Sequence, residues 1–261
     1  VSAILRKYID RFYKKEKEKW ESNHLEYRDI KKGDPNFHEE YELKIPSEEG
    51  SLIESIEELI DDGKKIYKSE NHDLPNVYFD KHLYQPLLVK DQKEKITTSP
   101  IGLNPNEEKF VKDLKTYIQN TNNESPLSDC EIYLLRNAER RGVGFFEAGN
   151  FYPDFIMWII KNSNQHIVFV DPHGFVQSAI KDGLEDNPKI GLSEKIKEIQ
   201  RTIGDSSITL DSFILSTTSE NELMSILDSQ SSLTKEELEN RHLIFQEEEK
   251  CIEKMFSILG Y

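Results

Sequence analysis

The chain has 261 residues, of which 32% are charged and 36% hydrophobic, and its formal net charge is −15. This length allows a sizeable hydrophobic core, but so acidic a composition excludes a protein that binds nucleic acid over its whole surface. Apolar runs are too short to cross a bilayer and the first residues do not resemble a signal peptide, so we expect a cytoplasmic protein with no membrane partner. Cys130 and Cys251 lie far apart in the sequence, so neither a structural zinc site nor a disulfide framework is predicted.

Residues 1–98 predict a mainly helical N-terminal region. Its charge is uneven, because residues 1–32 contain ten Lys and Arg against six acids, whereas residues 33–62 contain one Lys against eleven acids. A long polar helix is predicted over residues 2–32. Two interpretations of this helix stay open: a solvated helix that packs on a neighbour, or a basic arm that touches a phosphate backbone.

Shorter elements follow in the same region. Residues 33–50 predict a loop with an extended piece at 41–45, and residues 51–60 predict an amphipathic helix. His72 and His82 have no partner at the spacing of metal ligands, so both are interpreted as structural histidines.

The pattern becomes regular after residue 98, and we predict an α/β core over residues 99–230. Asn104-Pro105 marks the start of a helix whose apolar residues share one face up to about Gln119. Four strand-like segments follow, then a helix, a fifth strand and a short helix. The predicted strands are 131–137, 143–148, 152–160, 165–171 and 207–216, and the later helices are 193–203 and 219–227.

Residues 231–261 predict a C-terminal helix. Thr234 and Glu237 can form a capping box at its start. Over residues 234–259, apolar side chains repeat every seven residues, at Leu238, Phe245, Ile252 and Leu259. So narrow a stripe packs on another helix of this chain or on a partner, and both alternatives stay open.

Two of the predicted strands carry the candidate site. The runs 152–160 and 165–171 are apolar, and the polar turn 162–164 between them makes them antiparallel neighbours. Asp154 opens the first run and Asp171 closes the second, so both carboxylates come to the same end of the hairpin. Two acids at one end of a buried hairpin form a candidate metal site.

The order and spacing of these acids resemble the PD-(D/E)xK nuclease signature. Pro153-Asp154 corresponds to its first half and Asp171-Pro172-His173 to its second, with His in place of the usual Lys. The wider sequence resembles the C-terminal nuclease region of type III restriction-type DEAD/DEAH helicases, and this resemblance covers most of the chain. The segments that carry it are Tyr8-Ile-Asp-Arg-Phe12, Asp80-Lys-His-Leu-Tyr84, Leu134-Leu-Arg-Asn137, Gly142-Val-Gly-Phe-Phe146, Phe151-Tyr-Pro-Asp-Phe155 and Phe169-Val-Asp-Pro-His-Gly174.

The resemblance implies a fold and a cofactor. The fold is α/β with a restriction-endonuclease-like core, in which a mixed sheet is flanked by helices in the order α-β-β-β-α-β. The cofactor is Mg²⁺, with Mn²⁺ as a substitute, because Mg²⁺ takes carboxylate oxygens and waters as ligands. Asp154 and Asp171 are the expected ligands, and the resemblance adds an acid from the preceding helix, Glu107. Glu107 also has a competing explanation, since it can form a capping box with Asn104.

His173 is the main departure from the signature. A lysine would be a permanent cation there, whereas histidine is cationic only when its pKa is raised. Nearby carboxylates would raise this pKa and a bound Mg²⁺ would lower it. His173 is therefore interpreted as a general base or a phosphate contact, while a weak site and a purely structural turn histidine remain the alternatives.

Candidate contacts to nucleic acid lie near the predicted strand ends. Arg136, Arg140 and Arg141 lie near the turn between the first two core strands and are the expected phosphate contacts, although surface solubility explains them nearly as well. Gln165 is a further candidate contact. The chain has no GxxxxGK[ST] loop, so it is not expected to bind ATP by itself.

Together these features predict a Mg²⁺-dependent DNA endonuclease domain of a helicase-nuclease of restriction or phage-defence type. Its partners would be DNA and a helicase/ATPase domain in the same full-length chain or complex. The alternative is a catalytically inactive nuclease-like module that docks DNA or a partner protein. RNA as the substrate also stays open.

Overall fold

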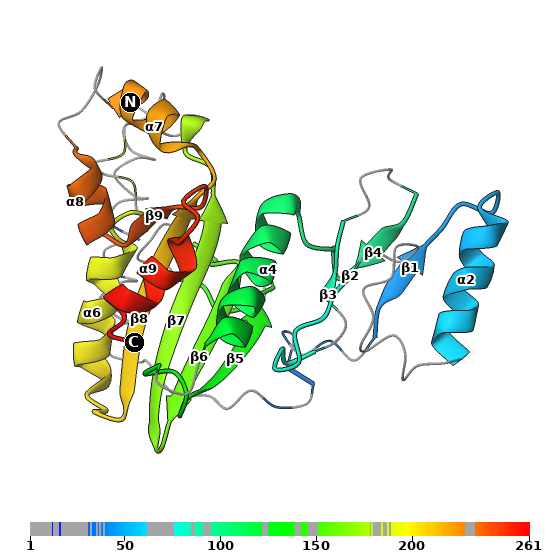
Figure 1. Cartoon of the computed structure of the whole chain (residues 1–261), viewed down its shortest axis with the longest axis horizontal. Helices are drawn as coiled ribbons and strands as arrows, with labels where there is room; N and C mark the ends of the chain where they lie inside the picture. Colours follow the sequence, from blue (N-terminus) through cyan, green and yellow to red (C-terminus); the bar gives the residue numbers. More distant parts are fainter. Residues whose placement is uncertain are drawn as a thin grey trace.

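The computed structural model describes residues 12, 16, 31, 33, 34, 36, 38, 40–61, 76–84, 87–90, 95–121, 125–138, 142–145, 151–177, 179, 184, 187, 189–227 and 233–261. In this part of the chain, a five-stranded mixed sheet flanked by helices forms the main body of the fold (Figure 1). No helix within these ranges is long and apolar enough to span a membrane.

The sheet has the strand order β5-β6-β7-β8-β9. β5, β6 and β7 pair antiparallel, whereas β8 runs parallel to β7 and β9 runs parallel to β8. Asn162 and Ser163 close the hairpin between β6 and β7, and Asn162 has a φ of 57°, a left-handed value that asparagine tolerates. A parallel neighbour needs a crossover connection, which α6 supplies between β7 and β8. The strands are β5 Glu131–Arg136, β6 Phe155–Lys161, β7 Asn164–His173, β8 Ile208–Ser216 and β9 Leu243–Phe245.

Helices cover the sheet. α4 packs on β6, where the rings of Phe110 and Phe155 lie 4.9 Å apart. α9 lies beside α4, and the ring of Tyr117 in α4 stacks on that of Phe256 in α9 with centroids 5.0 Å apart. α6 packs on β8. The helices are α4 Pro105–Asn120, α6 Leu192–Ile203, α7 Glu220–Leu227, α8 Lys235–Asn240 and α9 Cys251–Ile258.

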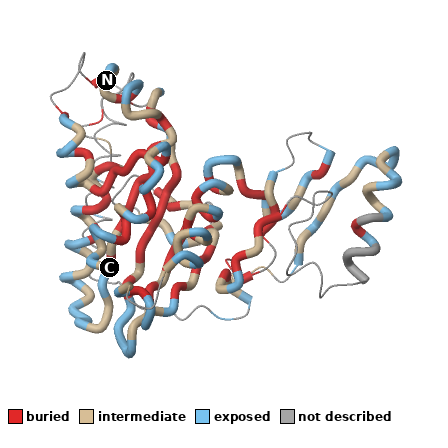
Figure 2. The backbone as a smooth tube through the Cα atoms, viewed as in Figure 1, coloured by how far each residue is buried: buried red, intermediate tan, exposed pale blue. Residues whose placement is uncertain are grey.

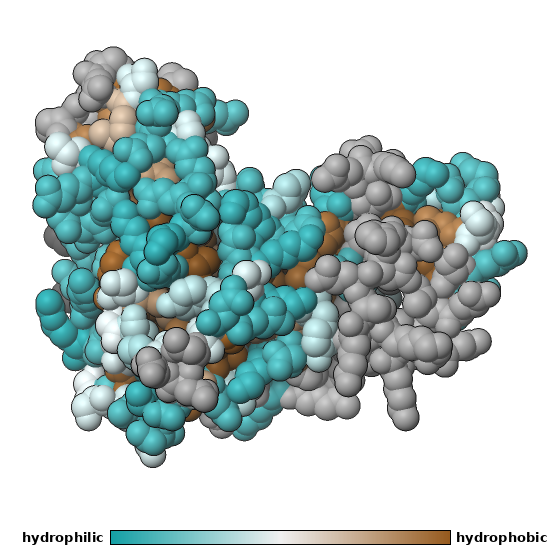
Figure 3. All heavy atoms as spheres, in the orientation of Figure 1, coloured by the Kyte–Doolittle hydropathy of each residue, from teal (hydrophilic) through white to brown (hydrophobic). Residues whose placement is uncertain are grey.

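The core lies between these helices and the sheet. Burial is greatest along the central strands β6, β7 and β8 (Figure 2), which are largely buried on both faces as expected for strands covered by helices. The face in view in Figure 3 is largely hydrophilic, in keeping with the high fraction of charged residues. Large side chains that are fully buried include Phe110, Phe155, Phe175, Phe213, Phe245 and Phe256.

The prediction of a mainly helical region over residues 1–98 stays a prediction, because much of this region lies outside the described residues. Between residues 40 and 99, the described residues contain one helix and four short strands, which form two antiparallel pairs, β1 with β4 and β2 with β3. The predicted extended piece at 41–45 contains β1 and the predicted helix 51–60 matches α2, whereas β2, β3 and β4 were not predicted. The predicted helix over 2–32 lies outside the described residues except for Phe12 and Glu16, which are helical, and Lys31, which is not. The elements are β1 Glu42–Lys44, α2 Gly50–Asp61, β2 Asn76–Val77, β3 Leu87–Leu88 and β4 Thr97–Ser99.

Buried His82 joins this region to the main sheet. Its Nε2 accepts the main-chain N–H of Arg136 at 2.8 Å, so Nδ1 carries the proton and donates to the carbonyl oxygen of Tyr84 at 2.5 Å. Burial lowers the pKa of His82 to about 3, and the ring stays neutral. The structural interpretation of His82 is confirmed, whereas His72 lies outside the described residues.

The predicted elements of the core are confirmed to within three residues at each end, with one exception. Residues 143–145 of the predicted strand 143–148 form no ladder and contribute only an isolated bridge, Phe145 with Phe151, and residues 146–148 lie outside the described ranges. A Cβ at Gly144 would lie 2.6 Å from the ring of Tyr152. This close approach places the backbone against an aromatic ring instead of a neighbouring strand.

The prediction of one C-terminal helix over 234–259 is wrong. The capping box of Thr234 and Glu237 is present, but α8 ends at Asn240 and His242 adopts a left-handed φ of 59°. The next residues form β9 and pair with β8, and α9 begins only at Cys251. Leu243, Ile244 and Phe245 are all buried, because pairing with β8 removes a continuous apolar run from water. The seven-residue spacing therefore arose by chance, because its residues belong to α8, β9 and α9 and not to one continuous helix.

Candidate active site

Asp154 and Asp171 lie together at one end of the β6-β7 hairpin. Asp154 directly precedes β6, and Asp171 is a buried residue near the end of β7. The main-chain N–H of Asp154 donates to Oδ1 of Asp171 at 3.3 Å. The antiparallel register, which pairs Phe155 with Val170, produces this contact. The prediction that the hairpin brings both acids to one end is confirmed.

The surroundings of Asp154 favour a bound positive charge. Burial raises the pKa of Asp154, and the carboxylates of Asp171 and Glu107 raise it further, to about 9, against a partial opposing effect of Arg136. At neutral pH this carboxyl group therefore holds a proton unless a cation takes its place. Such crowding of acids is common at functional sites.

Lys189 supplies a cation that sequence reasoning missed. Its Nζ donates to Oδ2 of Asp171 at 3.1 Å, lies 3.2 Å from Nδ1 of His173, and lies 4.5 Å from the centroid of the Phe151 ring. It belongs to the turn before α6, where Oδ1 of Asn187 accepts the main-chain N–H of Lys189 at 3.0 Å. Its distance along the chain from the hairpin hid it. The sequence offered one hint: position 173 holds His where the signature has Lys, so a lysine from elsewhere in the chain could take that place.

His173 is half-exposed beside this lysine. Burial and the Lys189 ammonium group lower the pKa of His173, and the opposing effect of Asp171 is smaller. The imidazole is therefore neutral at pH 7, and its Nδ1 can accept a hydrogen bond from Lys189. The sequence analysis anticipated that carboxylates would raise this pKa, and Asp171 does so, but it did not anticipate the opposing effect of Lys189.

Glu107 is buried in the first turn of α4. Its Oε2 accepts the main-chain N–H of Asn104 at 2.7 Å, while Oδ1 of Asn104 accepts the N–H of Glu107 at 3.0 Å. This reciprocal capping box is the one that the sequence suggested. The carboxylate also accepts two hydrogen bonds from Arg136, at 3.1 and 3.0 Å. Glu107 is close enough to raise the pKa of Asp154, but its oxygens are bound to the helix N-terminus and to Arg136.

The two described candidates for nucleic-acid contacts, Arg136 and Gln165, do not lie together. The guanidinium group of Arg136 points inward, to Glu107 and to the main-chain oxygens of Ile101 and Gly102. Gln165 pairs with Ile160 near the start of β7. Gln165 lies six positions before Asp171, which is about 20 Å along a strand. Arg140 and Arg141 lie outside the described residues.

Asn137 holds the backbone on both sides of the Pro153–Asp154 peptide. Its main-chain N–H donates to the carbonyl oxygen of Asp154 at 2.8 Å, and its buried side-chain amide donates to the carbonyl oxygen of Pro153 at 2.8 Å. The same side chain exchanges two hydrogen bonds with the main chain of Val143, at 2.8 and 3.0 Å. A Cβ at Gly142 would lie 2.0 Å from Oδ1 of Asn137, so this turn requires glycine. Asn137 therefore fixes Asp154, a role that the sequence did not reveal.

The donor set fits a divalent cation held by two carboxylates. Among the described residues, no group of three or more His, Cys, Asp or Glu side chains is arranged to hold a metal ion. Asp154 and Asp171 nevertheless suit Mg²⁺, which is bound in many enzymes by one or two carboxylates with waters in the remaining positions.

Comparison with known proteins adds no relative. No protein-family model matches the chain, and no curated protein or solved structure matches it. Function is therefore inferred from the residues and their geometry.

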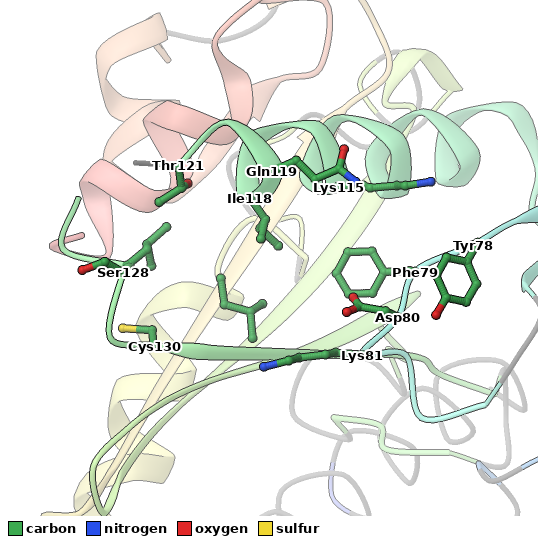
Figure 4. Close-up of a pocket in the computed structure, with 12 residues that line it drawn as sticks. Tyr78, Phe79, Asp80, Lys81, Lys115, Ile118, Gln119, Thr121, Ser128 and Cys130 are labelled. Atoms are coloured by element: carbon green, nitrogen blue, oxygen red, sulfur yellow. The ribbon is translucent and has the colours of Figure 1, made fainter. Parts of the chain in front are cut away.

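A cavity of about 550 Å³ lies away from the acidic site (Figure 4). It is bordered by the C-terminal half of α4, the start of β5 and residues 78–81, at the end of α4 opposite to Glu107. Asp80 is the one acid among the residues that border it, and neither Asp154 nor Asp171 reaches it. The cavity and the aspartate pair are thus separate features of the fold.

Proposed function

We propose that the chain is a Mg²⁺-dependent nuclease domain that hydrolyses DNA phosphodiester bonds. The observation that carries the proposal is the pair Asp154 and Asp171 at one end of the β6-β7 hairpin, with the ammonium group of Lys189 on Asp171. The order of α4, β5, β6, β7, α6 and β8 supports a restriction-endonuclease-like core, since it agrees with α-β-β-β-α-β. The sequence resemblance supports a place at the C-terminal end of a helicase-nuclease of restriction or phage-defence type, with a helicase domain as partner.

Each residue of this site has a role in this proposal. Asp154 and Asp171 hold the cation, which when bound supplies charge neutralisation at the phosphoryl oxygens and activation of a water. Lys189 provides the permanent positive charge that a neutral His173 lacks, and His173 orients the Lys189 ammonium group through Nδ1. Glu107 adds negative charge near Asp154, and Arg136 keeps the Glu107 carboxylate in place.

A non-catalytic module that docks DNA or a partner protein is the second candidate. One observation favours it: Lys189 already neutralises Asp171 without a metal ion. A site of this kind needs no Mg²⁺ to be stable, and it predicts that replacing Asp154 changes no function of the protein.

Cleavage of supercoiled plasmid with Mg²⁺ or Mn²⁺ tests the two candidates. The parent chain, Asp154→Asn and Asp171→Ala are compared with Asp129→Asn, which removes an exposed acid from the turn before β5. We expect cleavage by the parent and by Asp129→Asn, and none by the other two variants. The assay is repeated with single-stranded RNA and with the proposed helicase part present. Equal cleavage by all four proteins, or none in any setting while DNA still binds, contradicts the nuclease proposal.

A further inference from the structure

The starting point is that both oxygens of Asp171 already have partners. Oδ1 accepts the main-chain N–H of Asp154, and Oδ2 accepts the Lys189 ammonium group at 3.1 Å. The Asp171 side chain is buried, whereas that of Lys189 is one-quarter exposed. A cation arriving from solvent therefore meets a lysine on the oxygen that it would bind.

A lysine ammonium group and a divalent cation bound to the same oxygen of Asp171 would repel each other. Mg²⁺ binds carboxylate oxygens at about 2.0–2.1 Å, so an ammonium group left on Oδ2 would lie only about 4–5 Å from a doubly charged ion. Like charges at this separation repel strongly in a partly buried site. When the metal ion binds Oδ2 of Asp171, the Lys189 ammonium group therefore has to leave it, and while the ammonium group stays, metal binding is weakened.

Lys189 has the means to move without leaving the site. Its main chain is fixed, because Oδ1 of Asn187 accepts the Lys189 N–H and the carbonyl oxygen of Asn187 accepts the N–H of Gly191 at 3.2 Å. Its flexible four-carbon side chain reaches past the buried ring of Phe151 to Nδ1 of His173. These two contacts retain the ammonium group at the site when it leaves Asp171.

We infer that Lys189 and the divalent cation compete for Oδ2 of Asp171, and that the displaced ammonium group moves to the phosphate of the substrate. Lys189 is thus a catalytic residue with two positions: counter-ion of Asp171 before the metal binds, and phosphate contact afterwards. This inference rests on the proposed function. It implies that the lysine which promotes cleavage also weakens metal binding.

Direct measurement of Mn²⁺ binding tests the inference apart from activity. The EPR signal of free Mn²⁺ is followed during titration of the parent, Lys189→Met and Lys197→Met, the last of which removes an exposed lysine from α6. We expect Lys189→Met to bind Mn²⁺ roughly tenfold more tightly than the parent, since one repulsive charge is gone. Lys197→Met should bind like the parent. In the plasmid assay, Lys189→Met should cleave roughly 100-fold more slowly, which separates tighter metal binding from catalysis.

The thermal unfolding midpoints of the parent and Lys189→Met, with and without Mn²⁺, give a second measurement of metal binding. Without metal, Lys189→Met should melt below the parent because Asp171 loses its cation, and saturating Mn²⁺ should raise its midpoint more than that of the parent. Unchanged or weaker Mn²⁺ binding by Lys189→Met, with the parent still binding, overturns the competition and leaves the proposed function intact. Failure of every protein to bind Mn²⁺ removes the proposed function and the inference together.

Discussion

Arg136 donates to both carboxylate oxygens of Glu107, at 3.1 and 3.0 Å, from the end of β5 to the first turn of α4. Both side chains are largely buried. Arg136→Met would therefore leave a buried carboxylate without its partner, and we expect it to lower the free energy of unfolding by about 3 kcal/mol. Urea denaturation measures this loss, with Arg201→Met on the exposed side of α6 as control.

A second variant separates this structural role of Arg136 from a contact with DNA. Adding Glu107→Gln to Arg136→Met removes the unpaired charge, so part of the lost stability should return. If Arg136→Met instead unfolds like the parent and only weakens DNA binding, then Arg136 is the phosphate contact that its sequence position suggested.

Asp154→Asn should stabilise the metal-free protein while it abolishes cleavage. The folded state raises the pKa of Asp154 to about 9, so between about pH 4 and pH 9 it binds a proton that the unfolded chain releases. The stability of the parent therefore falls as pH rises through this window. Asparagine needs no proton, and we expect a gain of about 1–3 kcal/mol at pH 8 in EDTA and a flatter pH profile. If the free energy of unfolding of Asp154→Asn and of the parent depended on pH in the same way, the pKa of Asp154 would not be raised in the folded state.

Asp211 forms a second charged cluster, away from the candidate site. Its Oδ2 lies 3.2 Å from Nε2 of His166 and its Oδ1 lies 3.2 Å from Nδ1 of His242, which also contacts the main-chain oxygen of Ser212. Burial raises the pKa of Asp211, but the two histidines more than offset this and lower the pKa to about 2. The cluster ties β7 and β8 to the residue that precedes β9.

The Asp211 cluster gives a prediction for acid unfolding. A depressed pKa stabilises the folded state above about pH 4, and this stability is lost as pH falls from about 4 to 2. We expect Asp211→Asn to lower the free energy of unfolding by about 2 kcal/mol at pH 7 and by much less near pH 2. Chemical denaturation at the two pH values checks this, and a loss of equal size at both would contradict the assigned charge effect.

Asn137→Ala should weaken the site without touching a carboxylate. The variant loses the side-chain hydrogen bonds to Pro153 and Val143, which should cost about 2–3 kcal/mol in a buried setting. Because the Pro153–Asp154 peptide is then less firmly held, Mn²⁺ affinity should fall as well. Asn106→Ala, an exposed asparagine in α4, is the matched control. Unchanged Mn²⁺ affinity in Asn137→Ala would mean that β6 alone positions Asp154.

Sequence patterns failed where a segment depends on a distant partner. The stripe of Leu238, Phe245, Ile252 and Leu259 fits a helix locally, yet Phe245 lies in β9 because β8 offers a parallel edge. Lys189 and Asn137 were missed for the same reason, since each acts on a residue 16 to 18 positions away. Nothing in the neighbouring residues distinguishes them from an ordinary turn lysine and an ordinary strand-end asparagine.

The sequence by itself determined the β6-β7 hairpin, the meeting of Asp154 with Asp171 and the capping box of Glu107. These features depend on alternation, turn residues and spacings of a few positions, and short-range geometry follows from such patterns. Only the tertiary structure decided which cation faces the aspartates, and it placed Arg136 on Glu107 and Lys189 on Asp171. Long side chains reach partners set by the packing of whole elements, so their electrostatic roles emerge only when the sheet and helices are assembled.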